Sequence, residues 1–264
     1  MHFRKISPAL RAAFLLVATA FLFPSVSTAT GKLLQIGTLS ALSAGVYDGD
    51  TNLEPLQRPE TYGLGTFDKL DGEMVVLEGV TYRVDSSGHV TKPTTSTKVP
   101  FASVSILNEP DLSFDLGSIA SKAELEKLIL SKLESPNYPV LIVINARLDS
   151  IKTRSVPAQK KPYNPLAEVC ATQQQVFDLG AQEGTIVGFY CPEYMAGFNA
   201  PGFHLHFLND LHDAGGHVLE LAIKDGRARL QYLTGVQTIL PGLDSAFAAS
   251  DIGSAVPARK VQGE

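Results

Sequence analysis

The sequence predicts an α/β or α+β fold with mixed β-sheets. Between residues 63 and 90, turn signals such as the Asp-Gly pair at residues 71–72 separate short apolar segments, which is typical of β-strands. Residues 121–133 carry a helix signature, in which Ser121 and Glu124 form a capping box ahead of apolar residues that recur on one face. With 264 residues, 44% of them hydrophobic, the chain is long enough for one large domain or for two small ones that share a core.

Two further helices and a series of strands complete the expected elements. A short helix is expected at residues 39–47, and a longer one at residues 165–179, where Pro165 suits the first turn and Gly180 the end. The apolar face of the longer helix is expected to contain Leu166, Val169, Cys170, Val176 and Phe177. Strands are expected at residues 80–84, 100–107, 140–146, 185–191, 203–208, 217–223 and 227–232.

The first 29 residues are interpreted as a signal peptide. Three cations precede an apolar run at residues 12–23, which is shorter than the ~20 residues that a membrane span needs. Small residues follow Pro24, and cleavage is expected after Ala29. An uncleaved membrane anchor is the alternative. The protein is therefore expected to be secreted or otherwise extracytoplasmic, in the periplasm or the secretory route.

The remaining chain is expected to form two lobes and a tail. A boundary at the Ser-Pro-Asn sequence of residues 135–137 divides an N-terminal α/β lobe, residues 30–137, from a C-terminal mixed-sheet lobe, residues 138–245. Residues 246–264 form the tail. The C-terminal lobe contains the candidate metal ligands.

Charge and cysteine content limit the partners and the cross-links. The formal net charge is −5, and loss of the leader with its three cations and no acids makes it −8. Nucleic acids and anionic membranes bind basic faces, so neither is an expected partner once the leader is removed. Cys170 and Cys191 either form a disulfide, which export allows, or stay as thiols, with Cys170 acting as a small hydrophobe in a helix.

Histidines are concentrated in one short segment. Four of the six lie at residues 204–217, and His204 and His206 share a strand face because strand side chains alternate. If the next strand is a hairpin partner, His217 lies beside them. Three imidazoles on one face form a half-shell for Zn²⁺ with an open fourth position. The alternative is a set of polar residues on a wet strand, and His212, in the turn, is expected to be exposed.

Four motifs in order resemble the alpha-acetolactate decarboxylase family. The histidine segment H-x-H, followed 11 residues later by His217 across a D-x-G-G turn, is similar to that family's pattern. The other three are G-L-G-T-F-D-K-L-D-G-E at residues 63–73, T-R-S-V-P with a later P-Y at residues 153–163, and G-T-I-V-G-F with P-E-Y at residues 184–194. The resemblance implies two α/β lobes with the active site between them, a homodimer, and conversion of 2-acetolactate to (R)-acetoin and CO₂.

The resemblance also implies roles for individual residues. Decarboxylation leaves an electron pair beside a ketone, and zinc chelated by the substrate oxygens would stabilise the enediolate as a Lewis acid. Arg154 would bind the carboxylate with its guanidinium fork, and Glu73 would be the acid/base. Thr66 would hydrogen-bond the substrate or a zinc-bound water. Alternatives are a surface ion pair for Arg154, a turn role for Glu73 and strand packing for Thr66.

Two questions stay open in the sequence. The family has a second glutamate near the C-terminus, and here Glu264 is the candidate, although the position could instead correspond to Gln262. A flexible exposed tail is the alternative reading. The main function has two competitors: another exported zinc lyase or hydrolase acting on a small oxygenated acid, and an exported metal- or ligand-binding protein without catalysis.

Overall fold

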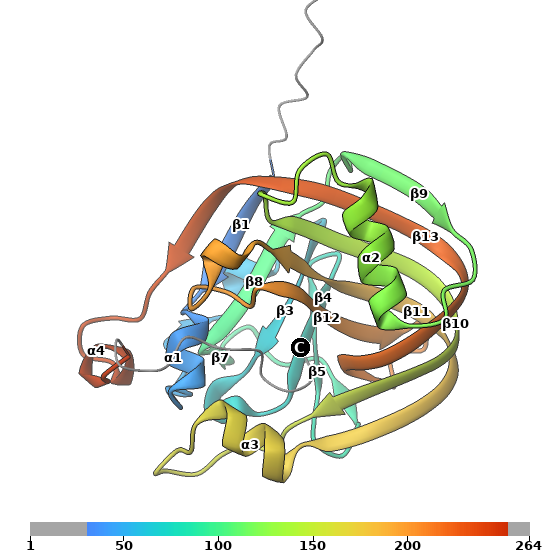
Figure 1. The fold of residues 1–264 in the computed structure, drawn as a ribbon. Helices are drawn as coiled ribbons and strands as arrows, with labels where there is room; N and C mark the ends of the chain where they lie inside the picture. Colours follow the sequence, from blue (N-terminus) through green and yellow to red (C-terminus); the bar gives the residue numbers. More distant parts are fainter. Residues whose placement is uncertain (1–30, 253–264) are drawn as a thin grey trace, which may run out of the picture.

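A computed structural model describes residues 31–252 of the chain (Figure 1). The expected signal peptide and the candidate residues Gln262 and Glu264 lie outside the described residues. Within the described range, no helix is both long and apolar enough to cross a membrane.

The described residues fold mostly into strands, with few helices. The strands are β1 Gly31–Ile36, β2 Thr51–Asn52, β3 Thr61–Thr66, β4 Glu73–Leu77, β5 Val80–Val84, β6 Val90–Thr91, β7 Lys98–Val99, β8 Phe101–Ile106, β9 Leu112–Leu116, β10 Val140–Ser155, β11 Gln175–Cys191, β12 Gly202–Asn209 and β13 Gly215–Ile239. The α-helices are α1 Leu39–Ser43, α2 Lys122–Lys132, α3 Leu166–Gln173 and α4 Ala246–Ala249. Short 3₁₀ helices span Glu54–Leu56, Asp68–Leu70 and Glu193–Met195.

One mixed sheet joins most of these strands. Within the described part of the chain it has 11 strands, and β2 pairs with β7 separately. Strand β1 runs parallel to β13 and antiparallel to β8, so it connects the early strands to the late ones. The expected mixed α+β fold is confirmed. The expected lobe boundary at residues 137–138 falls between α2 and β10, and it stays a prediction.

The long strands curve around one side of the molecule. Strands β10, β11, β12 and β13 pair in that order, and β13 also pairs with β10, so their pairings form a closed cycle. In Figure 1 these strands wrap around the side opposite α1, and α2 lies across their outer face. The cycle brings residues at the end of β10 beside residues at the start of β13.

Strand β10 is buried on both faces, as its apolar sequence predicts. Val140, Ile142 and Ile144 pack in the core beneath α2, whereas Leu141 and Val143 pack in the central core with residues of β3, β5 and β8. Side chains that alternate between two cores explain why the run is continuous rather than alternating with polar residues. The strand therefore separates two apolar layers.

The capping box of α2 is confirmed. The Ser121 side chain accepts a hydrogen bond from the Glu124 backbone N–H at 3.2 Å, and Glu124 in turn accepts one from the backbone N–H of Ala120 at 2.8 Å. Leu125 and Ile129 are fully buried against the sheet. The helix begins and ends within one residue of its expected limits.

The second expected helix is wrong in its last part. Helix α3 ends at Gln173, and residues 175–179 open strand β11, because Gln175 pairs with Ser155 of β10. Gly180, interpreted as a helix end, has φ +63° within that strand. Val176, expected to face inward, is 49% exposed. Pairing with β10 has overridden the local helical pattern.

Other boundaries also differ from those expected. Helix α1 ends at Ser43 instead of residue 47, because Gly45 with φ +87° turns the chain. Strands β1 and β9 have no prediction. The two strands expected after His217 form one strand, β13, and the expected tail contains α4.

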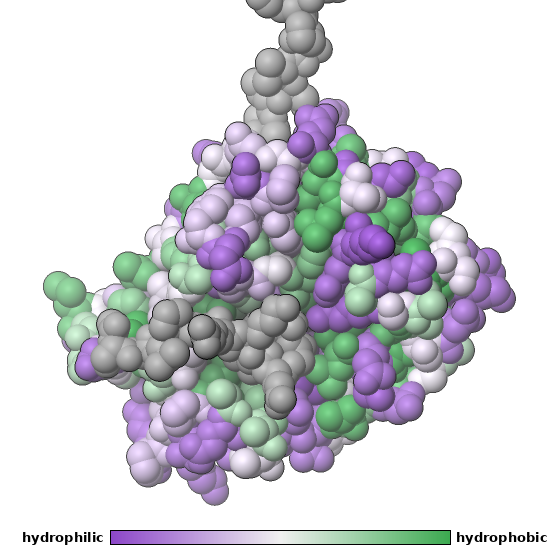
Figure 2. Space-filling view, in the orientation of Figure 1, coloured by the Kyte–Doolittle hydropathy of each residue, from purple (hydrophilic) through white to green (hydrophobic). Residues whose placement is uncertain are grey.

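Opposite charges lie side by side on the outside of the long strands. Arg227 pairs with Asp115 at 2.8 Å and Lys152 with Glu220 at 2.8 Å, and Arg147 pairs with Asp225. On the face shown in Figure 2, hydrophilic residues likewise alternate with strips of hydrophobic ones.

The two cysteines do not form a disulfide. Both belong to the described residues, and Cys170 on α3 and Cys191 at the end of β11 are buried as thiols. Burial raises the pKa of Cys191 to about 12.

A glycine in β11 allows close approach to the strand that holds two of the candidate ligands. A Cβ added to Gly188 would lie 2.0 Å from the backbone oxygen of His204 on β12. Gly188→Ala should therefore lower the free energy of unfolding by about 1–3 kcal/mol through overpacking. Urea unfolding measures the change. Gly117→Ala is the control, because a Cβ there has no neighbour within 4 Å; equal midpoints for the two variants would contradict the prediction.

Candidate metal centre and active site

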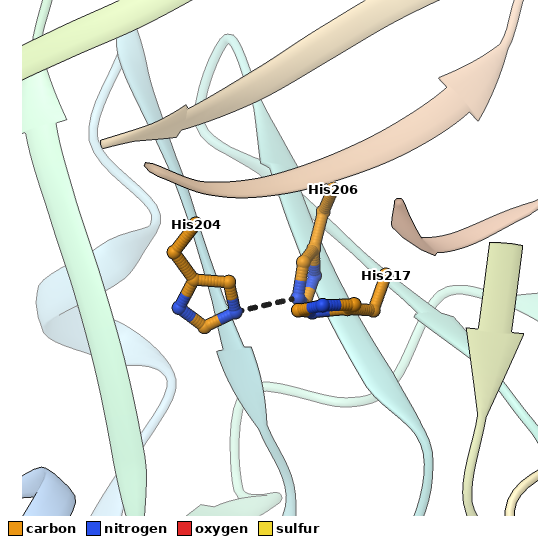
Figure 3. Close-up of side chains that lie close together, drawn as sticks. All are labelled: His204, His206 and His217. Atoms are coloured by element: carbon orange, nitrogen blue, oxygen red, sulfur yellow. Dashed lines mark hydrogen bonds between the residues drawn. The ribbon is translucent and has the colours of Figure 1, made fainter. Parts of the chain in front are cut away.

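Strands β12 and β13 bring three histidines together. His204 and His206 point from the same face of β12, whereas Phe203, Leu205 and Phe207 pack in the core on its other face. His217 lies directly opposite His206 in the antiparallel register. Figure 3 shows the three imidazoles turned toward one another. The expected hairpin and the shared face are confirmed.

The three rings have the separation that a single ion needs. One nitrogen from each ring lies within 4.8 Å of the other two, and all three residues are buried. The ring centroids are 5.0–5.3 Å apart, and the Nε2 atoms of His204 and His206 are 3.2 Å apart. Imidazole nitrogens with this convergence could hold a metal ion.

A backbone carbonyl orients one of the rings. Nδ1 of His206 lies 2.7 Å from the carbonyl oxygen of Met74 on β4. Because a carbonyl only accepts, Nδ1 must carry the hydrogen, which leaves the lone pair of Nε2 facing His204 and His217. Hydrogen bonding of the second ring nitrogen is how proteins orient metal-binding histidines.

Burial keeps the histidines neutral. It lowers the pKa of His206 from 6.5 to about 3, with a further lowering by the nearby Arg154 cation and an opposing effect of the Met74 carbonyl. Burial is also the main reason that the pKa of His204 lies well below its usual value, and His206 and Arg154 add to the effect. Neutral imidazole is the form that binds metal.

Electron-rich atoms converge at this point. Oε2 of Glu73 lies 3.4 Å from Nε2 of His206, whose lone pair faces it, and Nε2 of His204 lies on the same side. A neutral His206 cannot form an ion pair with Glu73, so these acceptors gain little from one another. A cation among them would satisfy several lone pairs at once, which is why this donor set fits a divalent metal.

Arg154 and Glu73 come from opposite sides of the site and meet. Arg154 lies opposite His217 in the β10–β13 pairing, and Glu73 begins β4. Nη1 of Arg154 is 3.2 Å from Oε1 of Glu73, and the two side chains are 5% and 9% exposed. Arg154 is therefore in a buried ion pair rather than at the surface, and Glu73 faces the histidines.

Thr66 lies next to Glu73 across the β3–β4 hairpin. Its hydroxyl donates to the carbonyl oxygen of Gly72 at 2.8 Å, which leaves its oxygen able to accept. Thr66, Glu73, Arg154, His204 and His217 all line one small pocket.

The structure thus brings together six of the seven predicted site residues. Glu264 lies outside the described residues, so its part stays a prediction. His212, expected to be exposed, is exposed, and its ring contacts Tyr82 instead of the triad. Sequence reasoning missed the Met74 carbonyl, since backbone groups leave no composition signal. It also missed the apolar pocket residues Leu42 and Leu166.

Comparison with known proteins identifies the family. The profile of the alpha-acetolactate decarboxylase family matches residues 33–254. This chain belongs to that family. The alpha-acetolactate decarboxylase of Methanosarcina mazei is 40% identical over 79% of this chain and 72% of its own length, and that of Bacillus subtilis is 34% identical over 83% and 85%.

Solved structures of the alpha-acetolactate decarboxylase family share the fold. The crystal structure of the enzyme from Bacillus subtilis strain 168 superposes with a TM-score of 0.78 at 31% identity, covering 88% of this chain and 99% of that one. A Staphylococcus aureus protein described as similar to alpha-acetolactate decarboxylase also gives 0.78, at 28% identity, covering 85% and 96%. The chain is accordingly a carboxy-lyase.

The histidine triad predicts a metal-binding defect for one substitution. His206→Ala removes the nitrogen that Met74 orients, so the protein should lose most of its bound divalent metal, a change that elemental analysis after dialysis measures. His212→Ala is the matched control, because that ring lies nearby but outside the triad. Equal metal content in the two variants would rule out this site.

Proposed function

We propose that the protein is a zinc-dependent enzyme that decarboxylates 2-acetolactate to (R)-acetoin and CO₂. The observation that carries the proposal is the convergence of three neutral imidazoles with Arg154 and Glu73 in one buried pocket. Membership of the alpha-acetolactate decarboxylase family supplies the reaction. The geometry supplies a role for each side chain.

Zinc suits the donor set. Three histidine nitrogens are a common catalytic zinc set, and they leave a coordination position for water or substrate. When bound, the ion would act as a Lewis acid toward the substrate oxygens. His204, His206 and His217 would hold it, and Met74 would keep the His206 ring in the correct orientation.

Arg154 is placed to bind the substrate carboxylate. Its Nε is buried and has no hydrogen-bond acceptor among residues 31–252. A buried donor without an acceptor is costly, and a carboxylate in the pocket would accept from it. Loss of CO₂ removes the charge that Arg154 binds, so the cation favours the substrate over the product.

Glu73 is placed to move a proton. One carboxylate oxygen contacts Arg154 and the other faces His206, so the group is fixed at the wall of the pocket between the guanidinium and the triad. From there it can take the proton of the substrate hydroxyl or deliver one to the carbon that loses CO₂. Thr66 would accept or donate a hydrogen bond to the substrate beside it.

Three further features belong to the proposal. The leader at residues 1–29 would direct export, so that the enzyme acts outside the cytoplasm. The enzyme would be a homodimer. Glu264, or Gln262 in its place, would complete the proton-transfer machinery.

Metal content and product formation together test the function. The purified protein should contain about one zinc per chain and release CO₂ and acetoin from 2-acetolactate, and a chelator should remove both the metal and the activity. Added zinc should restore them. A protein with one zinc per chain and no acetoin would instead be a different zinc lyase or hydrolase, and full activity without metal would end the zinc assignment.

Arg154→Lys separates substrate binding from metal binding. Lysine keeps the charge beside Glu73 but lacks the guanidinium fork, so kcat/KM should fall by about 10²- to 10³-fold while zinc content stays unchanged. Arg154→Ala should also lose turnover, but it leaves Glu73 buried without its cation, at a cost of about 3–5 kcal/mol in stability. Acetoin assays, elemental analysis and urea unfolding measure the three quantities; wild-type turnover by Arg154→Lys would remove Arg154 from the mechanism.

A further inference from the structure

The pocket that contains the polar site has an apolar half. Its polar lining consists of Thr66, Glu73, Arg154 and two of the histidines. The apolar side chains opposite them come from α1, α3, β8 and two connecting segments: Leu39, Leu42, Leu70, Phe101, Val156 and Leu166. None of these is more than 6% exposed.

Two short helices contribute the wall, and they pack against each other. Leu39 and Leu42 lie on α1, Leu166 begins α3, and the two helices are in contact. All three leucines also belong to the central core, so the wall continues into the packed interior.

Hydrogen bonds fix α1 from both ends. At its start, the backbone N–H groups of Leu39 and Ser40 donate to the carbonyl oxygens of Phe198 and Gly197 at 3.0 and 2.8 Å. Just beyond its end, the Tyr47 hydroxyl donates at 2.9 Å to the carbonyl oxygen of Asn164, two residues before α3. The wall is therefore held on both sides and has little freedom to yield.

We propose that Leu42 and Leu166 are specificity-determining residues, forming a fixed wall that limits the length of the alkyl groups on the substrate. The inference rests on the proposed function and deepens it. It assigns the polar half of the pocket to the carboxylate, hydroxyl and ketone, and the apolar half to the alkyl substituents.

The chemistry of the substrate matches this division. 2-Acetolactate has three oxygen-bearing groups and two methyl groups. Burying methyl groups beside buried leucines is favourable, whereas placing them against Arg154 or Glu73 would desolvate charge without compensation. The pocket is narrow, with about 30 Å³ open to the centres of water-sized molecules, so an added methylene displaces wall atoms.

Shortening the wall should shift selectivity rather than only lower activity. The probes are 2-acetolactate and its two one-carbon homologues, 2-ethyl-2-hydroxy-3-oxobutanoate and 2-hydroxy-2-methyl-3-oxopentanoate. For the zinc-loaded enzyme, kcat/KM is measured for each by CO₂ release. In Leu42→Ala or Leu166→Ala, the ratio of a homologue to 2-acetolactate should rise by about tenfold, the usual discrimination for one methylene in an apolar pocket.

Leu125→Ala is the matched control. Leu125 is as fully buried as the wall residues, but it lies on α2 in the other core and does not line the pocket. Its substitution loosens the interior without enlarging the site, so its ratio should stay at the wild-type value. Leu42→Val and Leu166→Val provide smaller versions of the change for the case in which an alanine variant does not fold.

The outcomes are distinguishable. A raised ratio for either homologue in a wall variant, but not in Leu125→Ala, supports the proposal. Unchanged ratios in all folded wall variants, or an equal rise in the control, overturn it while wild-type decarboxylation of 2-acetolactate leaves the proposed function intact. A zinc-loaded wild-type enzyme that does not decarboxylate 2-acetolactate rejects the proposed function itself.

Discussion

The burial of three neutral imidazoles around one point is the constraint on which the rest of the site depends. Removed from water, His204, His206 and His217 need partners, and the Met74 carbonyl satisfies only one ring nitrogen. The same burial lowers the pKa of His206 to about 3, so the lone pairs stay available at ordinary pH. Unfavourable desolvation of polar groups and readiness to bind a cation are thus two results of one arrangement.

The rest of the fold serves to bring charge to that point. The closed pairing of β10 to β13 carries Arg154 beside His217, although 63 residues separate them in the chain. The β3–β4 hairpin supplies Thr66 and Glu73 from the early strands, which β1 connects to the late ones. Burying an arginine and a glutamate together is tolerable because each neutralises the other, and it holds a carboxylate beside the triad.

Where the sequence prediction failed, long-range pairing had opposed a local preference. Residues 174–179 follow a helix and have helical spacing, yet they extend because β10 offers a full set of hydrogen-bond partners. Residues 140–146 and 121–133 gave correct elements because local pattern and tertiary environment agree there. The H-x-H pair was likewise readable from alternation alone, whereas the place of His217 required the register of a hairpin that the sequence only made possible.

The sequence by itself determined the shared face of His204 and His206, the capped helix α2, and the order of the family motifs, because each depends on neighbours within a few residues. Only the tertiary structure decided that Arg154 meets Glu73, that a Met74 carbonyl orients His206, and that Leu42 and Leu166 form a wall opposite the charges. These contacts join segments about 80 to 130 residues apart, and their geometry depends on strand register and curvature, which no local pattern encodes.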